Sequence, residues 1–303
     1  MKIIIGIDVT ANYKRALTFI AKALGLNHTI NLVHCFDPNF PYAGEVALSP
    51  EISQKYAEEL EVDGISILKE AEEEARRLGF TDFSSKLIKM PPTSGLIYEA
   101  SEFNAELIAV GTHHKGSFSA FYSDGITKAL TLSSPQNILS VNHDYEYKIS
   151  PVAVFATDHS FYSNAALSEL LEMPLPGVKE FKVLSAYVLA GKLKSAVAHV
   201  LGLSNAEPDH WIIEELEKKN SEVVNRLVNA GYKAKSIVVE GNPNTAIADF
   251  MKTGDAQFLI IGAQGHGFFN LGNLGSVAVH QVVNGNYPVL VLRPKVEFAS
   301  ANQ

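Results

Sequence analysis

The chain has 303 residues, of which 47% are hydrophobic and 19% charged, a composition typical of a soluble globular protein with a substantial core. At ~150 residues per domain, this length favours about two domains. The net charge of −8 and the lack of a basic stripe argue against nucleic acid as a partner. No run reaches the ~18 apolar residues of a membrane-spanning helix, so we expect no membrane segment.

The single cysteine indicates a reducing environment. Cys35 excludes an intrachain disulfide, and its place in the apolar run 30–36 favours a buried structural thiol over a reactive one. The N-terminus lacks the pattern of a secretory signal peptide, because Lys2 is followed by only a short apolar run before Asp8. We therefore expect a cytoplasmic protein.

The chain repeats one pattern of elements at a period of about half its length. Segments 2–10 and 152–160 each indicate an apolar strand that ends in Asp-x-Ser/Thr, which makes Asp8 and Asp158 equivalent. A helix with i, i+3/i+4 apolar spacing follows in each half, and then a second strand. These second strands are predicted at 30–36 and 181–188.

Each half continues with a variable stretch and an amphipathic helix. These helices are predicted at 49–78 and 208–230, with Ile52 and Val228 among the residues that face inward. A glycine follows each helix directly, as is typical of helix C-termini. A third strand, a short helix, a fourth strand and a fifth strand are then predicted at 85–90, 94–103, 106–111 and 137–141, and at 235–240, 244–253, 257–262 and 288–292.

The stretch 257–276 carries the most specific signal. Its apolar run is typical of a parallel strand buried on both faces, and a glycine-rich loop and a second apolar pattern follow it. Glycines let a ligand approach the main chain, and free N–H groups at a helix N-terminus suit phosphate. Ser276 is placed to cap that helix and to donate its hydroxyl to a phosphate oxygen. A loop whose glycines only form turns is the alternative.

The spacing of the glycines distinguishes between known phosphate-binding motifs. Neither G-x-x-x-x-G-K-[ST] nor G-x-G-x-x-G occurs here. The loop instead has Gly262-x2-Gly265-x9-Gly275-Ser276. It resembles the ATP-binding signature of the universal stress protein family, G-x2-G-x9-G-[ST], at every defined position.

The start of the second half adds to this resemblance. Asp158-x-Ser160-x-x-Ser163-x-x-Ala166 looks like the family's N-terminal D-x-S-x-x-S-x-x-A pattern. The resemblance implies that Asp158 lies beside the nucleoside and that the main chain of Tyr187 meets adenine. Capping of the following helix by Asp158 is an alternative that is compatible with this role. Together the signals assign nucleotide binding to Asp158, Ser160, Tyr187, Gly262, Gly265, His266, Gly267, Gly275, Ser276 and Val277.

The loop of the first half departs from the signature. Gly111, His114, Asp124 and Gly125 are the counterparts of Gly262, Gly265, Gly275 and Ser276. The Cβ of His114 blocks close backbone approach, and Asp124 puts a carboxylate beside the phosphates. At ~5 Å and an effective dielectric near 20, such a contact costs about 3 kcal/mol, or about a hundredfold in affinity. We therefore predict a degenerate nucleotide loop in the first half.

Alternating strands and helices predict a parallel sheet with helices on both faces and a ligand site beyond the C-terminal strand ends. The resemblance implies an α/β fold of two repeated Rossmann-like, adenine nucleotide alpha hydrolase-like units, each a five-stranded parallel sheet of order 3-2-1-4-5. We predict domains at 1–147 and 148–303, the second with the intact loop. Single units of the family pair, partly through the fifth strand, so we expect an internal pseudo-dimer, with a homodimer also open.

The function implied is ATP binding, with or without Mg²⁺, at one ATP per chain in the second domain. The protein would act in stress response or signalling, with an unidentified protein partner whose association depends on nucleotide state. We find no evident base to activate water and no cluster with metal-ligand spacing, and we interpret His113 and His114 as loop residues. We therefore predict no catalytic and no metal-binding residue. A slow ATPase or phosphotransferase, or a nucleotide-free module for a small apolar ligand or a protein, are the alternatives.

Overall fold

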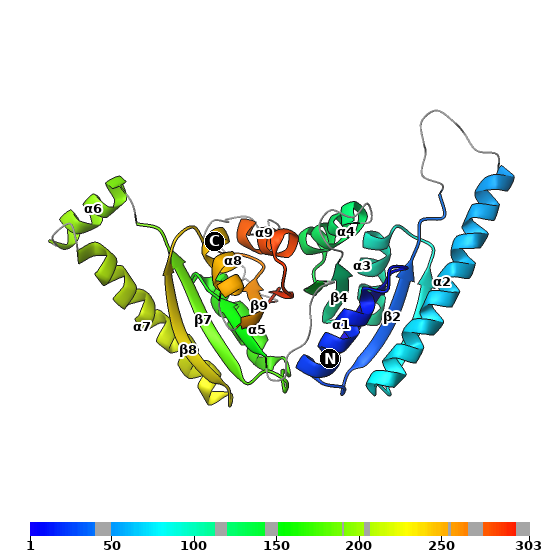
Figure 1. The fold of residues 1–303 in the computed structure, drawn as a ribbon, viewed down its shortest axis with the longest axis horizontal. Helices are drawn as coiled ribbons and strands as arrows, with labels where there is room; N and C mark the ends of the chain where they lie inside the picture. The colour runs from blue at the N-terminus through cyan, green and yellow to red at the C-terminus, as the bar shows by residue number, and fades with distance from the viewer. Residues whose placement is uncertain are drawn as a thin grey trace, which may run out of the picture. The chain divides into compact units, whose positions relative to one another are not determined.

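The computed structural model describes residues 1–39, 50–112, 120–142, 151–189, 191–202, 207–253, 256–265 and 275–294. The chain divides into two compact units, Met1–Tyr147 and Lys148–Gln303. In each unit strands alternate with helices along the chain (Figure 1). His113, His114, His266 and Gly267, which the sequence analysis singles out, lie outside the described residues.

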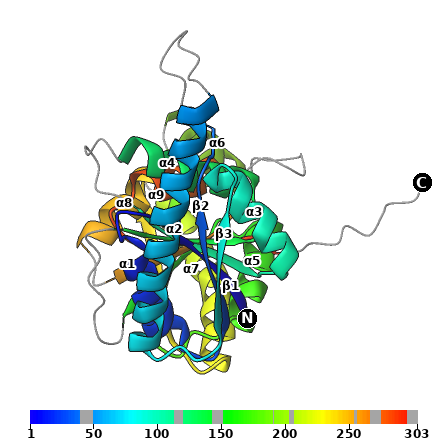
Figure 2. The ribbon, with the colours of Figure 1, turned by 90° about the vertical axis from the view of Figure 1, so that its right-hand side faces the viewer.

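The first unit is a parallel sheet of order β3-β2-β1-β4-β5. Its strands are β1 (Lys2–Ile7), β2 (Thr29–Cys35), β3 (Phe83–Ile88), β4 (Leu107–Thr112) and β5 (Asn137–Asn142). Its helices are α1 (Tyr13–Phe19), which continues as the π-helical turn η1 (Ile20–Leu24), α2 (Pro50–Leu78), α3 (Pro92–Phe103) and α4 (Ala120–Ser133). Helices α1 and α2 pack together, as do α3 and α4, and α2 lies along β2 and β3 (Figure 2).

The second unit repeats this order as β8-β7-β6-β9-β10. Its strands are β6 (Val152–Ala156), β7 (Glu180–Tyr187), β8 (Lys233–Glu240), β9 (Ala256–Gly262) and β10 (Val289–Leu292). Its helices are α5 (Phe161–Glu172), α6 (Gly191–Leu201), α7 (Glu207–Asn229), α8 (Pro243–Thr253) and α9 (Ser276–Asn284). The predicted α/β fold and strand order are confirmed. Helix α6 was not predicted, because it lies in the stretch that we interpreted only as variable.

The central strands are apolar along their whole length because helices cover both faces of each sheet. Ile3, Ile4 and Ile5 in β1 are fully buried, as are Leu259 and Ile260 in β9. Burial of such side chains contributes about 1.5–3 kcal/mol each. These strands are therefore the rigid elements whose C-terminal ends carry the loops.

Two residues predicted to face inward are exposed. The side chains of Ile52 and Val228 are each 50% exposed. Ile52 lies in the first turn of α2, whose buried positions begin only at Gly64, so this end of the helix has no sheet to pack on. Val228 follows the buried Leu227 directly and so points about 100° away from it around α7. No helix in the described part of the chain is long and apolar enough to cross a membrane.

Candidate functional site

A cavity of about 350 Å³ lies in the second unit where β6 and β9, which are neighbours, reach their C-terminal ends. Parallel sheets place their ligand sites at such ends. Six of the ten residues predicted to bind a nucleotide line it, namely Asp158, Gly262, Gly265, Gly275, Ser276 and Val277. The cavity therefore joins two sequence motifs that lie about a hundred residues apart in the chain.

Asp158 and Gly265 meet closely in this cavity. One carboxylate oxygen of Asp158, Oδ1, accepts a hydrogen bond from the backbone N–H of Ser160 at 3.0 Å. A Cβ atom added at Gly265 would lie 2.5 Å from the other oxygen, Oδ2. Real Cβ atoms do not approach an oxygen this closely, so a side chain at position 265 would force the Asp158 carboxylate to shift. The first glycines of the loop thus place main chain, rather than side chains, against Asp158.

Ser160 caps helix α5. Its Oγ accepts a hydrogen bond from the backbone N–H of Ser163 at 3.1 Å, and its side chain is buried. The alternative in which Asp158 caps this helix is therefore wrong, because Asp158 lies two residues too early. Ser160 is not among the residues that line the cavity. It acts on the site by holding the turn on which Asp158 is carried.

We expect Ser160→Ala to lower the free energy of unfolding by about 1 kcal/mol, because an N-cap side chain contributes about that much. Urea unfolding monitored by circular dichroism measures the change. A midpoint equal to that of the parent would show that the cap does not stabilise α5.

The N-terminus of α9 also lines the cavity. Gly275 is its N-cap residue, with φ −62° and ψ 132°, and Ser276 is the first helical residue. The prediction that Ser276 caps the helix is therefore wrong, since the extended residue that precedes a helix takes that position. The N–H of Gly275 donates to the carbonyl of Ala263 at 2.7 Å. The N–H groups of Ser276 and Val277 belong to the first turn and have no partner inside the helix.

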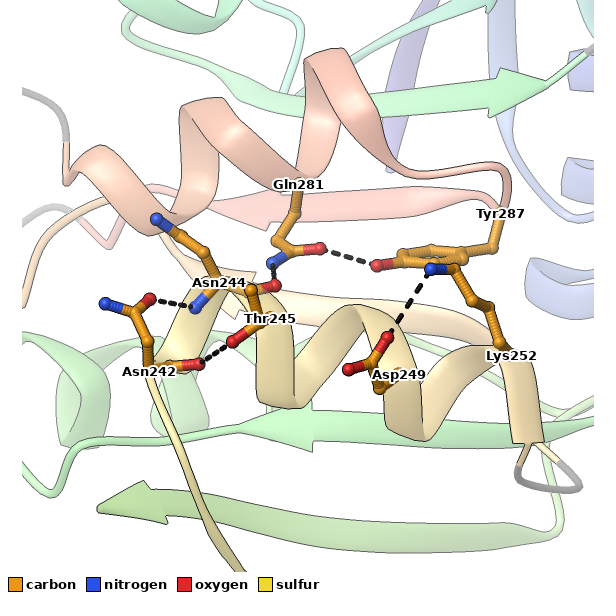
Figure 3. Close-up of polar contacts among 7 residues, drawn as sticks. All are labelled: Asn242, Asn244, Thr245, Asp249, Lys252, Gln281 and Tyr287. Atoms are coloured by element: carbon orange, nitrogen blue, oxygen red, sulfur yellow. Dashed lines mark hydrogen bonds and ion pairs between the residues drawn. The ribbon is translucent and has the colours of Figure 1, made fainter. Parts of the chain in front are cut away.

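Buried polar contacts hold α9 in place (Figure 3). The side chain of Gln281, which is 1% exposed, donates from Nε2 to the carbonyl of Asn244 in α8 at 2.9 Å. Its Oε1 accepts from the Tyr287 hydroxyl at 2.5 Å, and burial raises the pKa of that tyrosine. Buried hydrogen bonds of this kind are costly to break. They therefore set the position of the α9 N-terminus relative to α8.

The remaining wall of the cavity is apolar. It is formed by Leu184 and Ala186 of β7 and by Pro243 and Ile247 of α8. The predicted Tyr187 is not among the lining residues, and its carbonyl accepts from the N–H of Gly241 at 2.7 Å. The β7 residues that line the cavity are Leu184 and Ala186, and the contact of adenine with the main chain of Tyr187 stays a prediction.

Two hydroxyl groups in the cavity were not predicted as site residues. The side chains of Thr157 and Ser163 both line it, and their hydroxyl oxygens are 2.7 Å apart. Both side chains are buried, so these hydroxyls are fixed by each other rather than by solvent. The sequence offered a signal for them, because Thr157 precedes Asp158 directly and Ser163 is the second serine of the D-x-S-x-x-S pattern.

His159 connects the turn that carries Asp158 to β7, the second strand of the unit. Its backbone is left-handed, with φ 58°, and its ring Nε2 lies 3.0 Å from the hydroxyl of Ser185 in β7. The Ser185 hydroxyl lies 2.8 Å from Oδ1 of the buried Asn220 in α7. Burial lowers the pKa of the His159 imidazole below its ordinary value, which favours the neutral ring. The turn that carries Asp158 is thus held by the cap of α5 at Ser160, by Ser185 of β7 and, through Ser185, by Asn220 of α7.

The sequence profile of the universal stress protein family matches residues 1–142 and again residues 152–293. The chain belongs to this family. Because the profile matches twice, it is a tandem universal stress protein.

Known proteins agree with this assignment. Universal stress protein MJ0577 of Methanocaldococcus jannaschii is 30% identical over 148 residues, which cover 42% of this chain and 90% of that protein. The crystal structure of a universal stress protein from Archaeoglobus fulgidus aligns over 97% of this chain and 96% of its own, with a TM-score of 0.63 at 16% identity. That of PA1789 from Pseudomonas aeruginosa, described as functionally unknown, aligns over 97% and 92%, with a TM-score of 0.59 at 14% identity. These two structures share the fold.

The first universal stress protein unit has a cavity at the matching place. It measures about 300 Å³, and Asp8 and Gly111 are among its lining residues. Its helix after the fourth strand begins differently, however. Helix α4 starts at Ala120, so Gly125, the counterpart of Ser276, lies five residues inside it. The N–H groups of Gly125 and Ile126 are in the helix interior, where backbone hydrogen bonds normally engage them. At the positions that match Ser276 and Val277, the described part of the first unit thus has the interior of a helix rather than a free helix N-terminus.

Within the described residues, no group of three or more His, Cys, Asp or Glu side chains is placed to hold a metal ion.

Proposed function

We propose that this tandem universal stress protein binds ATP, at one ATP per chain, in the cavity of its second unit. The observation that carries the proposal is that Asp158 and the first turn of α9 line the same cavity, together with Gly265 and Gly275. A volume of about 350 Å³ falls in the range of small-molecule sites, which is ~300–1,000 Å³.

The nucleoside would occupy the end of the cavity near Asp158. The carboxylate is an acceptor suited to ribose hydroxyl groups, and Thr157 and Ser163 add hydroxyls beside it. The base would lie against Ala186 and Ile247, which give the cavity apolar surface. Apolar walls with a few placed polar groups are what a ring with polar edges requires.

The phosphates would lie against the first turn of α9. The N–H groups of Ser276 and Val277 and the Ser276 hydroxyl are donors, and the helix N-terminus carries a partial charge of roughly +0.5. Gly265 and Gly275 let the phosphates approach the main chain. The contacts proposed for His266 and Gly267 complete this end, and Mg²⁺ would bind through the phosphates.

We further propose that nucleotide state controls the association of this protein with a protein partner, in cytoplasmic stress response or signalling. Membership of the universal stress protein family and the neutral chemistry of the site support a binding role. A slow ATPase would differ by measurable turnover, which a phosphate-release assay with and without Mg²⁺ detects.

Calorimetric titration of the full chain with a non-hydrolysable ATP analogue tests the site. We expect a stoichiometry of one. Asp158→Asn is expected to weaken binding, because the carboxylate accepts more strongly than a neutral amide. The matched variant Asp8→Asn, at the equivalent position of the first unit, is expected to bind as the parent does.

Two outcomes would contradict the proposal. One is a stoichiometry near two with similar affinities. The other is a loss of binding in Asp8→Asn that Asp158→Asn does not show, since it would move the nucleotide to the first unit.

A further inference from the structure

The first unit retains the shape of a ligand cavity while losing the groups that would hold a phosphate. Its cavity of about 300 Å³ is mainly aliphatic. Its apolar lining consists chiefly of Ile7, Val33, Cys35, Leu96, Val110 and Ile126. A cavity of this size and lining takes an apolar molecule without the cost of desolvating polar groups.

The polar groups at this cavity are engaged within the protein. Asp8 accepts at Oδ1 from the N–H of Tyr13 at 3.3 Å, and at its other oxygen from the Thr10 hydroxyl. The ring Nδ1 of the buried His34 lies 2.8 Å from the carbonyl of Ile7 and hydrogen-bonds to it. A ligand that enters this cavity therefore meets mainly carbon surface, with the Asp8 carboxylate, the Thr10 hydroxyl and the His34 ring already hydrogen-bonded within the protein. Thr127 is a further polar residue of the lining.

A comparison of equivalent positions shows which side chains beside the aspartate differ between the two units. Ile7 and Tyr13 stand in the same places relative to Asp8 as Thr157 and Ser163 do relative to Asp158. The hydroxyl pair of the second cavity is thus replaced by an aliphatic side chain and by a fully buried tyrosine. The hydroxyls that would hold a ribose beside the aspartate are absent from these positions.

An anion is disfavoured in this cavity. The interior of α4 offers it no free N–H groups, because the helix starts five residues before Gly125. The aliphatic lining likewise favours an uncharged molecule.

We propose that the cavity of the first unit is a second binding site, which takes an uncharged, largely apolar small molecule. This site is separate from the proposed ATP site, so that one chain would respond to a nucleotide and to an apolar ligand. The proposal does not depend on ATP binding by the second unit.

The test uses the full chain and the uncharged fluorophore N-phenyl-1-naphthylamine. We expect a saturable rise in fluorescence at one probe per chain, which neither the ATP analogue nor adenosine displaces. Displacement by the ATP analogue at concentrations that fill its own site would overturn the proposal. So would displacement by adenosine at the concentrations at which the probe binds, because the site would then be a nucleoside site.

Two cavity-filling variants test which of the two cavities binds the probe. Val110 and Ile261 hold equivalent positions on β4 and β9, each next to its central strand, and each lines the cavity of its unit. Val110→Phe is expected to abolish saturable probe binding, and Ile261→Phe to leave it unchanged. The reverse pattern would overturn the proposal.

Cys35 provides a measurement that needs no substitution. It is the single cysteine of the chain and lines this cavity, where burial raises its pKa to about 12. Its reaction with the small uncharged reagent methyl methanethiosulfonate is expected to slow severalfold when the probe is bound. An unchanged rate at saturating probe would overturn the proposal even if Val110→Phe fails to fold.

Discussion

Gly275→Asp is expected to abolish ATP binding and to leave the fold intact. A Cβ at Gly275 has room, because its nearest neighbour would be the carbonyl oxygen of Ala263 at 3.4 Å. Aspartate is a favoured N-cap residue, so its carboxylate would accept from the first-turn N–H groups of α9. It would then hold the donors proposed for the phosphates and repel the nucleotide by about 3 kcal/mol, more than a hundredfold in affinity.

The variant is informative because ATP binding is expected to be lost while the stability of the fold is kept or slightly raised. Calorimetry with the ATP analogue should show no binding, while the thermal unfolding temperature stays equal to that of the parent or rises slightly. Gly275→Asn is the matched control, because asparagine caps equally well but carries no charge. It should bind more tightly than Gly275→Asp. If Gly275→Asp binds ATP as the parent does, the N-terminus of α9 is not the phosphate site.

Gly111→Ala is expected to destabilise the first unit by about 3 kcal/mol, whereas Gly262→Ala costs below about 1 kcal/mol. These glycines hold equivalent positions, since Gly262 is the last residue of β9 and Gly111 the last but one of β4. A Cβ at Gly111 would lie 2.4 Å from the backbone carbon and oxygen of Asn12, which cannot move without displacing α1. A Cβ at Gly262 would meet only the Ala166 side chain at 3.3 Å and the Gln264 carbonyl at 3.4 Å.

Urea unfolding of the full-length variants, followed by circular dichroism, measures both costs. The first transition of Gly111→Ala should move to markedly lower urea concentration, and that of Gly262→Ala should remain close to the parent's. Equal midpoints in the two variants would show that the start of α1 yields easily, contrary to the packing described. In the second unit, Gly262→Ala should also narrow the cavity and weaken ATP binding modestly.

Several predictions that rest on local pattern are confirmed by the structure. Helix ends at Gly79 and Gly231 follow from a backbone that only glycine adopts readily, and both residues have positive φ, 99° and 94°. Boundaries shifted by a few residues, as β3 and β8 each begin two residues before the predicted start. The N-cap residues of helices were less predictable. Ser160 and Gly275 are N-caps because each has an extended backbone, which depends on the φ and ψ of that one residue. Sequence pattern does not specify those angles.

The sequence by itself determined the repeat, the α/β class and the family, because periodic apolar runs and a fixed glycine spacing are local properties that each half carries alone. Only the tertiary structure decided what those motifs form. Asp158 meets Gly265, more than a hundred residues away, because β6 and β9 are neighbours in the sheet. Likewise, the start of α4 at Ala120 places Gly125 and Ile126 inside a helix, where the second unit has the free first turn of α9. Both are long-range effects, since cavities are bounded by side chains that the fold brings together and not by consecutive residues.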